Sequence, residues 1–200
     1  MADFLAWVSG SGVVQGIIIG ATLAFLTAIV VLNAVGRTIT TNVNGWSSVP
    51  KVGQPANGIL VRAAASKALP VVNVFEEAAY WTTTMDGSRG KLNGAHEYVI
   101  HFPADGLPPN DAFWSLTITD VVGYIVNNPL DRSSFNDRSD LAKNADGSID
   151  IYLQHQAPTG RERNWLPTPA GKFKLTLRAY LPGEAILNGT YRVPPVTRAR

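Results

Sequence analysis

The stretch Val13–Val35, VVQGIIIGATLAFLTAIVVLNAV, decides how this chain is organised. No Asp, Glu, Lys or Arg occurs between Phe4 and Gly36. A helix needs about 20 apolar residues to cross the hydrocarbon core of a bilayer. A surface helix of a soluble protein would instead carry polar side chains along one face. The sequence therefore predicts one transmembrane helix, and the length of the apolar run favours an anchor that is kept over a cleaved secretory signal.

Small residues recur every four positions along this predicted helix. They are Gly12, Gly16, Gly20, Ala24 and Ala28. Small side chains let the backbones of two membrane helices approach closely, and such contacts drive association where lipid replaces water. We interpret the five residues as a helix-packing ridge, although Gly is also common in membrane helices for other reasons.

Composition limits the possible functions of the rest of the chain. The 200 residues include 17 Lys and Arg, 15 Asp and Glu, and no Cys. The basic residues form no block, so the sequence does not predict nucleic-acid binding. Without Cys there can be no disulfide, thiolate zinc site or cysteine nucleophile. We expect neither a cofactor nor a metal.

The chain is expected to fall into three parts. Residues 1–36 hold the N-terminal segment and the transmembrane helix, and residues 37–57 form a polar tether in which Trp46 would sit at the membrane interface. Residues 58–200 form the extramembrane domain. This domain is expected to begin with a helix over Gly58–Leu69, ended by Pro70, and a helical turn over Val74–Ala79.

Short strands with alternating apolar residues follow. The clearest runs place one apolar set on one face: Tyr98, Ile100 and Phe102; Trp114, Leu116 and Ile118; Ile149, Ile151 and Leu153; Phe173, Leu175, Leu177 and Ala179. Further strands are expected over residues 81–85 and 123–126, with a polar loop over residues 131–140. Such strands separated by turn residues predict a mainly β fold, an antiparallel β-sandwich.

Short motifs in this region occur in an order that resembles the bacterial domain-of-unknown-function family twelve-fourteen. They are Leu92-Asn93-Gly94, Tyr98, His101-Phe102-Pro103, residues 112–117, Asp120, Gly123, Asn128-Pro129-Leu130, Asp131-Arg132, residues 144–148, Ile151-Tyr152, residues 164–167 and residues 173–180. The resemblance covers roughly residues 61–196. It implies a jelly-roll-like sandwich that is usually outside the cytoplasm, and it implies no established reaction.

The orientation in the membrane is open at this point. The basic residues nearest the anchor, Arg37 and Lys51, follow it, and the positive-inside rule then places the domain in the cytoplasm. The family resemblance instead favours a single-pass protein of the bacterial inner membrane with its domain in the periplasm.

No catalytic motif is apparent. The run Asn144–Ile149 resembles part of a calcium loop, but Ala142 and Leu153 fall where that loop requires carboxylates, so we interpret the run as a turn. His96, His101 and His155 show no metal-binding spacing. Arg132 is expected to pair with Asp120 or Asp131. We therefore predict that the protein is not an enzyme.

Aromatic and basic side chains suggest one possible surface contact. Trp165 follows Arg161 and Arg163 in the sequence and precedes Pro167. The candidate contact residues are Trp165, Arg161, Arg163 and Trp46.

Two functions remain open. The first is a non-catalytic accessory subunit of a larger membrane complex, whose partners are integral membrane subunits and the lipid bilayer. The alternative is a membrane-anchored sugar- or lipid-binding module or an envelope hydrolase.

Overall fold

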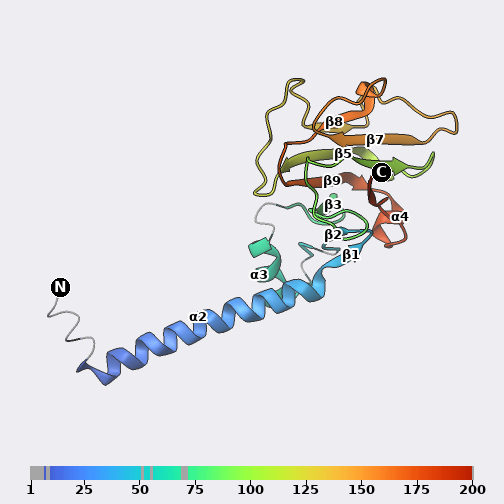
Figure 1. The fold of residues 1–200 in the computed structure, drawn as a ribbon. Helices are drawn as coiled ribbons and strands as arrows, with labels where there is room; N and C mark the ends of the chain where they lie inside the picture. Colours follow the sequence, from blue (N-terminus) through green and yellow to red (C-terminus); the bar gives the residue numbers. More distant parts are fainter. Residues whose placement is uncertain (1–6, 8–9, 51, 55, 69–71, 200) are drawn as a thin grey trace. The chain divides into compact units, whose positions relative to one another are not determined.

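The computed structural model describes residues 7, 10–50, 52–54, 56–68 and 72–199 (Figure 1). The chain divides into two compact units. Unit 1 comprises residues 1–39 and 55–71, and unit 2 comprises residues 40–54 and 72–200. The two units are described separately below.

Unit 1 consists of two helices. Helix α2 (Gly12–Ile39) contains the predicted apolar stretch and has no buried residue. By length and composition it could cross a membrane, a test that a signal sequence also passes. Helix α3 (Ile59–Ala68) packs against α2, and the Lys67 Nζ donates a hydrogen bond to the Asn33 Oδ1 2.6 Å away. Helix α3 confirms the expected helix over Gly58–Leu69, except that Leu69 and Pro70 lie outside the described residues.

Unit 2 is built from two β-sheets. The six-stranded sheet has the order β1-β2-β3-β9-β5-β6, with β1 Thr41–Val43, β2 Trp46–Ser48, β3 Ala78–Thr83, β9 Phe173–Pro182, β5 Asn110–Asp120 and β6 Ser134–Asn136. The four-stranded sheet has the order β10-β4-β7-β8, with β10 Val196–Arg198, β4 Tyr98–Phe102, β7 Ile149–Gln154 and β8 Trp165–Pro167. The single-turn elements η1 (Glu162–Asn164) and α4 (Glu184–Leu187) connect strands.

The core lies between the inward faces of the two sheets. All four predicted apolar sets are buried there, so these strands and their alternation are confirmed. The ring centroids of Tyr98 on β4 and Phe173 on β9 are 6.0 Å apart, edge to face, and they join the two sheets. The fold is mainly β and sandwich-like. One pairing differs from the prediction, since β7 and β8 run parallel and the second sheet is therefore mixed.

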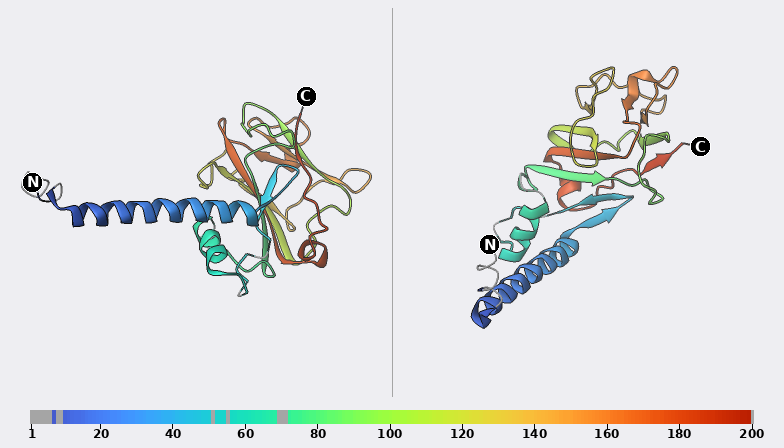
Figure 2. Two further views of the ribbon diagram at one scale, coloured as in Figure 1. Left: turned by 90° about the horizontal axis from the view of Figure 1, so that it is seen from below. Right: turned by 60° about the vertical axis from the view of Figure 1, so that its left-hand side comes forward.

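The largest correction concerns the predicted tether. Residues 40–54 belong to unit 2, and within them β1 and β2 form a hairpin that extends the six-stranded sheet beyond β3 (Figure 2). Strands of three residues are too short to show an alternating pattern, so the sequence did not reveal them. The indole of Trp46 is not available as an interface anchor, because it is buried. It is 1% exposed, within the core.

Smaller corrections concern three other segments of unit 2. Strand β3 begins at Ala78, earlier than expected, and the predicted helical turn before it is limited to hydrogen bonds from the Glu77 and Ala78 amides to the Val74 carbonyl oxygen. Strand β6 lies inside the predicted polar loop of residues 131–140. Residues 123–126 form a loop and not a strand.

Candidate binding groove

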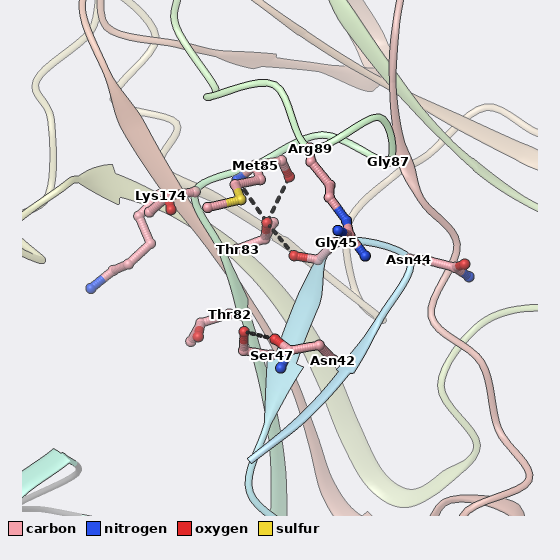
Figure 3. Close-up of a pocket in the computed structure, with 11 residues that line it drawn as sticks. Asn42, Asn44, Gly45, Ser47, Thr82, Thr83, Met85, Gly87, Arg89 and Lys174 are labelled. Carbon is pink, nitrogen blue, oxygen red and sulfur yellow. Dashed lines mark hydrogen bonds between the residues drawn. The ribbon is translucent and has the colours of Figure 1, made fainter. Parts of the chain in front are cut away.

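The candidate site is a polar groove in unit 2 with a volume of about 590 Å³. It lies where the β1–β2 hairpin meets β3 and the loop that follows β3 (Figure 3). Its lining residues are Asn42, Asn44, Gly45, Ser47, Thr82, Thr83, Thr84, Met85, Gly87, Arg89 and Lys174.

The floor is formed by polar side chains that lie at paired positions on three adjacent strands. Asn42 on β1 pairs with Ser47 on β2, and Ser47 pairs with Thr82 on β3. These residues alternate with Trp46 and Trp81, which point to the core, so the floor belongs to the outer face of the sheet. The Ser47 hydroxyl donates a hydrogen bond to the Asn42 Oδ1 2.6 Å away (Figure 3).

One rim of the groove is the Asn44-Gly45 turn. Both residues have positive φ, 54° and 85°, as a tight hairpin turn with this sequence requires. A Cβ on Gly45 would lie 2.8 Å from the Asp86 carbonyl oxygen, so only glycine lets the turn approach the next loop. The buried Thr83 hydroxyl lies within hydrogen-bonding distance of the Gly45 carbonyl oxygen (2.8 Å) and the Met85 carbonyl oxygen (2.6 Å).

The loop after β3 forms the second rim. The Asp86 Oδ1 accepts hydrogen bonds from the amides of Ser88 and Gly90, so this carboxylate is engaged within its own loop. Arg89 has a φ of 67°, and the loop presents its side chain at the groove (Figure 3). Lys174 on β9 lies at another side of the floor.

The donors and acceptors of this groove suit binding of a polar ligand. Hydroxyl and amide groups line it together with two cations, and no carboxylate, histidine or aromatic ring is among the lining residues. Within the described residues, no group of three or more His, Asp or Glu side chains is placed to hold a metal ion. The lining supplies hydrogen-bonding groups and positive charge for recognition.

The predicted contact residues around Trp165 are brought together at η1 and β8, but the indole does not face solvent. Trp165 is 7% exposed, and its Nε1 donates to the Gln154 carbonyl oxygen 2.8 Å away. The Arg161 guanidinium lies 4.9 Å from the centroid of the Tyr152 ring, and Arg163 forms an ion pair with Asp140. The predicted surface contact is therefore wrong for Trp46 and Trp165, because both indoles are part of the buried interior.

The small residues of α2 lie on an exposed helix. Apart from the neighbouring backbone of α2 itself, no described atom lies within 4 Å of a Cβ built on Gly12, Gly16 or Gly20. Ala24 and Ala28 are exposed. The packing ridge therefore stays a prediction.

Other polar residues that the sequence singled out have separate structural partners. The Nδ1 of His101 lies 2.7 Å from the Asp150 Oδ1, and the Nδ1 of His155 lies 2.9 Å from the Thr168 carbonyl oxygen. Arg132 does not pair with Asp120 or Asp131. It donates to the carbonyl oxygens of Glu162 and Trp165, which fixes η1 to the loop before β6.

The sequence did not identify the groove residues. The Asn44-Gly45 turn was visible, but the groove needs residues 42–47, 82–89 and 174 to meet, and only the strand register brings them together.

The family comparison concerns the region from β3 to the segment just after β9. The model of the family described as "Protein of unknown function (DUF1214)" matches residues 77–184. The chain belongs to this family. The match includes Thr82, Arg89 and Lys174 of the groove, whereas Asn42 and Ser47 precede it.

Among the solved structures that match the chain are the following two. The VPA0106 protein from Vibrio parahaemolyticus is 30% identical, with a TM-score of 0.61 over 70% of this chain and 35% of that one. An uncharacterized protein from Burkholderia cenocepacia is 17% identical, with a TM-score of 0.45 over 62% of this chain and 30% of that one. The chain thus matches about a third of the length of each. None of the curated proteins matches the chain.

Proposed function

We propose that this protein is a non-catalytic accessory subunit of a larger membrane complex. Helix α2 crosses the bacterial inner membrane once, and unit 2 is a jelly-roll-like sandwich on the periplasmic side. The observation that carries the proposal is that α2 has no buried residue although it is apolar on all sides. Large side chains such as those of Val13, Ile17, Phe25 and Val30 are exposed, and lipid or partner helices would cover them.

The ridge of small residues supports docking of α2 against another membrane helix. The open space at Gly12, Gly16 and Gly20 would admit a partner backbone at close range. Integral membrane subunits are therefore the expected partners.

An apolar loop on unit 2 supports a second contact outside the membrane. Val121, Val122, Tyr124 and Ile125 are all more than half exposed. The Asp120 Oδ1 accepts hydrogen bonds from the amides of residues 122, 123 and 124, which holds the loop in one conformation. Exposed apolar patches of this kind mark interaction surfaces.

The test is the double substitution Gly16→Leu/Gly20→Leu in the full chain, purified in mild detergent. We expect the stoichiometric membrane partners to be lost, because two leucine side chains separate the helix backbones. A matched variant, Ile18→Leu/Phe25→Leu, changes the same helix without filling the ridge and should keep the partners. Equal recovery of partners with both variants, measured by quantitative mass spectrometry, would contradict the proposal.

The polar groove favours a second candidate, a membrane-anchored sugar- or lipid-binding module. Its lining of hydroxyl, amide and cationic groups resembles a recognition surface more than a packing surface. The groove gives less support to an envelope hydrolase, since its lining lacks a carboxylate pair.

A further inference from the structure

A row of polar side chains crosses the six-stranded sheet on its outer face. The paired residues, strand by strand, are Asn42, Ser47, Thr82, Thr176, Thr117 and Ser134. Neighbouring strands lie about 4.8 Å apart, so the row presents one polar group at about that interval. The repeat of an extended chain of sugar rings is close to this interval, which lets successive rings meet successive strands.

The groove exposes only one end of this row. Asn42, Ser47 and Thr82 form its floor. Farther along, Thr176 is buried, and the Thr117 hydroxyl already accepts a hydrogen bond from the Arg178 Nη1 3.0 Å away. A ligand would therefore lie over β1, β2 and β3 and end near β9.

The groove has hydrogen-bonding groups that are not used within the protein. Within the part of the chain that the structure describes, the hydroxyls of Thr82 and Thr84 have no hydrogen-bond partner. Hydroxyls both donate and accept, which matches the hydroxyls of a sugar.

The charged side chains around the groove differ in whether they are free to bind a ligand. Asp86 lies in the loop that forms one rim, and Asp120 interacts electrostatically with Lys174. Backbone amides of their own loops engage both carboxylates. The side chains of Arg89 and Lys174 form no hydrogen bond or ion pair with any residue that the structure describes. Guanidinium and ammonium groups bind carboxylates through charge-assisted hydrogen bonds.

We propose that the groove binds an acidic oligosaccharide, with its sugar hydroxyls over Ser47 and Thr82 and its carboxylates at Arg89 and Lys174. This inference names a ligand class for the binding-module candidate. It does not depend on α2 crossing a membrane, so loss of co-purifying subunits and loss of glycan binding are separate results.

The test measures binding of defined oligosaccharides to the full chain in detergent micelles by isothermal titration calorimetry. The probes are oligomers of galacturonate, glucuronate and mannuronate, and the matching neutral oligomers of galactose, glucose and mannose. We expect at least one acidic oligomer to bind and its neutral counterpart to bind more weakly. Arg89→Gln, Lys174→Gln and Thr82→Val should each weaken binding, by about tenfold for the two charge removals.

Two matched variants serve as controls. Arg138→Gln removes an exposed cation beyond the opposite edge strand β6, and Thr197→Val removes an exposed hydroxyl on the other sheet. Both should bind like the unchanged protein. Thermal unfolding shows whether each variant is folded. The proposal is overturned if no acidic oligomer binds, if neutral oligomers bind equally well, or if folded groove variants bind like the controls.

Discussion

The Nε1 of Trp46 donates a hydrogen bond to the Pro194 carbonyl oxygen 2.8 Å away. This contact joins the β1–β2 hairpin to the segment before the last strand, β10. The hairpin lies near the start of unit 2 in the sequence, and this segment lies near its end. The indole is also part of the core. The Asn44 Nδ2 donates a second hydrogen bond to this segment, to the Val193 carbonyl oxygen 2.9 Å away. The hairpin is thus held to the segment by burial and by two side-chain hydrogen bonds.

Replacing Trp46 should therefore destabilise unit 2. Trp46→Ala removes a large buried side chain, and we expect a loss of about 3–5 kcal/mol in the free energy of unfolding. Trp46→Phe keeps an aromatic ring but reduces the buried volume and leaves the Pro194 carbonyl oxygen without this donor, for a smaller loss of about 1–3 kcal/mol. Chemical denaturation followed by circular dichroism measures both. Tyr124→Ala, at an exposed position, should change stability by less than about 0.5 kcal/mol.

Gly45 should not tolerate alanine. Its positive φ disfavours a side chain by about 1–2 kcal/mol, and the added Cβ would meet the Asp86 carbonyl oxygen at 2.8 Å. Gly45→Ala is expected to lower the unfolding temperature clearly. In Gly171→Ala the new Cβ meets nothing within 4 Å, so its unfolding temperature should stay close to that of the unchanged protein. Equal effects of the two substitutions would contradict this account of the turn.

Asn164 should stabilise the connection between β7 and β8. Its side chain donates to the carbonyl oxygens of Ala142 and Asp150 and accepts from the Ala142 amide, at 2.7–2.9 Å. Asn164→Ala leaves these groups without partners in a buried position, and we expect a loss of roughly 2–4 kcal/mol in the free energy of unfolding. Asn127→Ala, which changes an exposed asparagine, is the control and should have little effect.

The loop after Asp120 should loosen in acid. Hydrogen bonds from the amides of Tyr124, Gly123 and Val122 lower the pKa of Asp120 below its ordinary value of 3.8, with Lys174 adding to the effect. A lowered folded-state pKa means that the stabilisation is complete above the ordinary value and disappears as the pH falls through the folded-state pKa. Amide hydrogen exchange of residues 122–124 should therefore lose protection only in strong acid.

The variant Asp120→Asn tests the same contact at neutral pH. Because the amide is uncharged, exchange protection of residues 122–124 should fall, while Asp105→Asn should leave it unchanged. Full protection in Asp120→Asn would show that the carboxylate does not hold the loop.

The sequence predicted the parts of the fold that rest on long patterns. The apolar run of α2 and the alternation in β4, β5, β7 and β9 are long enough to show their period. Strands β1, β2 and β6 have three residues each, and a three-residue strand has too few positions to differ from a loop. Trp46 on β2 was misplaced for this reason, because an isolated tryptophan suits a membrane interface and a core equally well.

The site was less predictable than the fold for a different reason. Ser47, Thr82 and Lys174 are ordinary solvent-facing residues when each strand is taken alone. They form one surface only because β2 pairs with β3 and β3 with β9 in a particular register. Register depends on contacts between distant segments, which the local sequence does not contain.

The outermost strands of unit 2 have one property in common. Strands β1 and β6 bound one sheet, β10 and β8 bound the other, and in the described chain each of these four has three residues. A foreign strand can add to a sheet only where a long row of free backbone amides and carbonyls is available, and these borders offer very little. Unit 2 is thereby protected against fibril growth and accidental strand exchange when many copies are crowded together. We therefore expect lasting association of unit 2 to use its side chains.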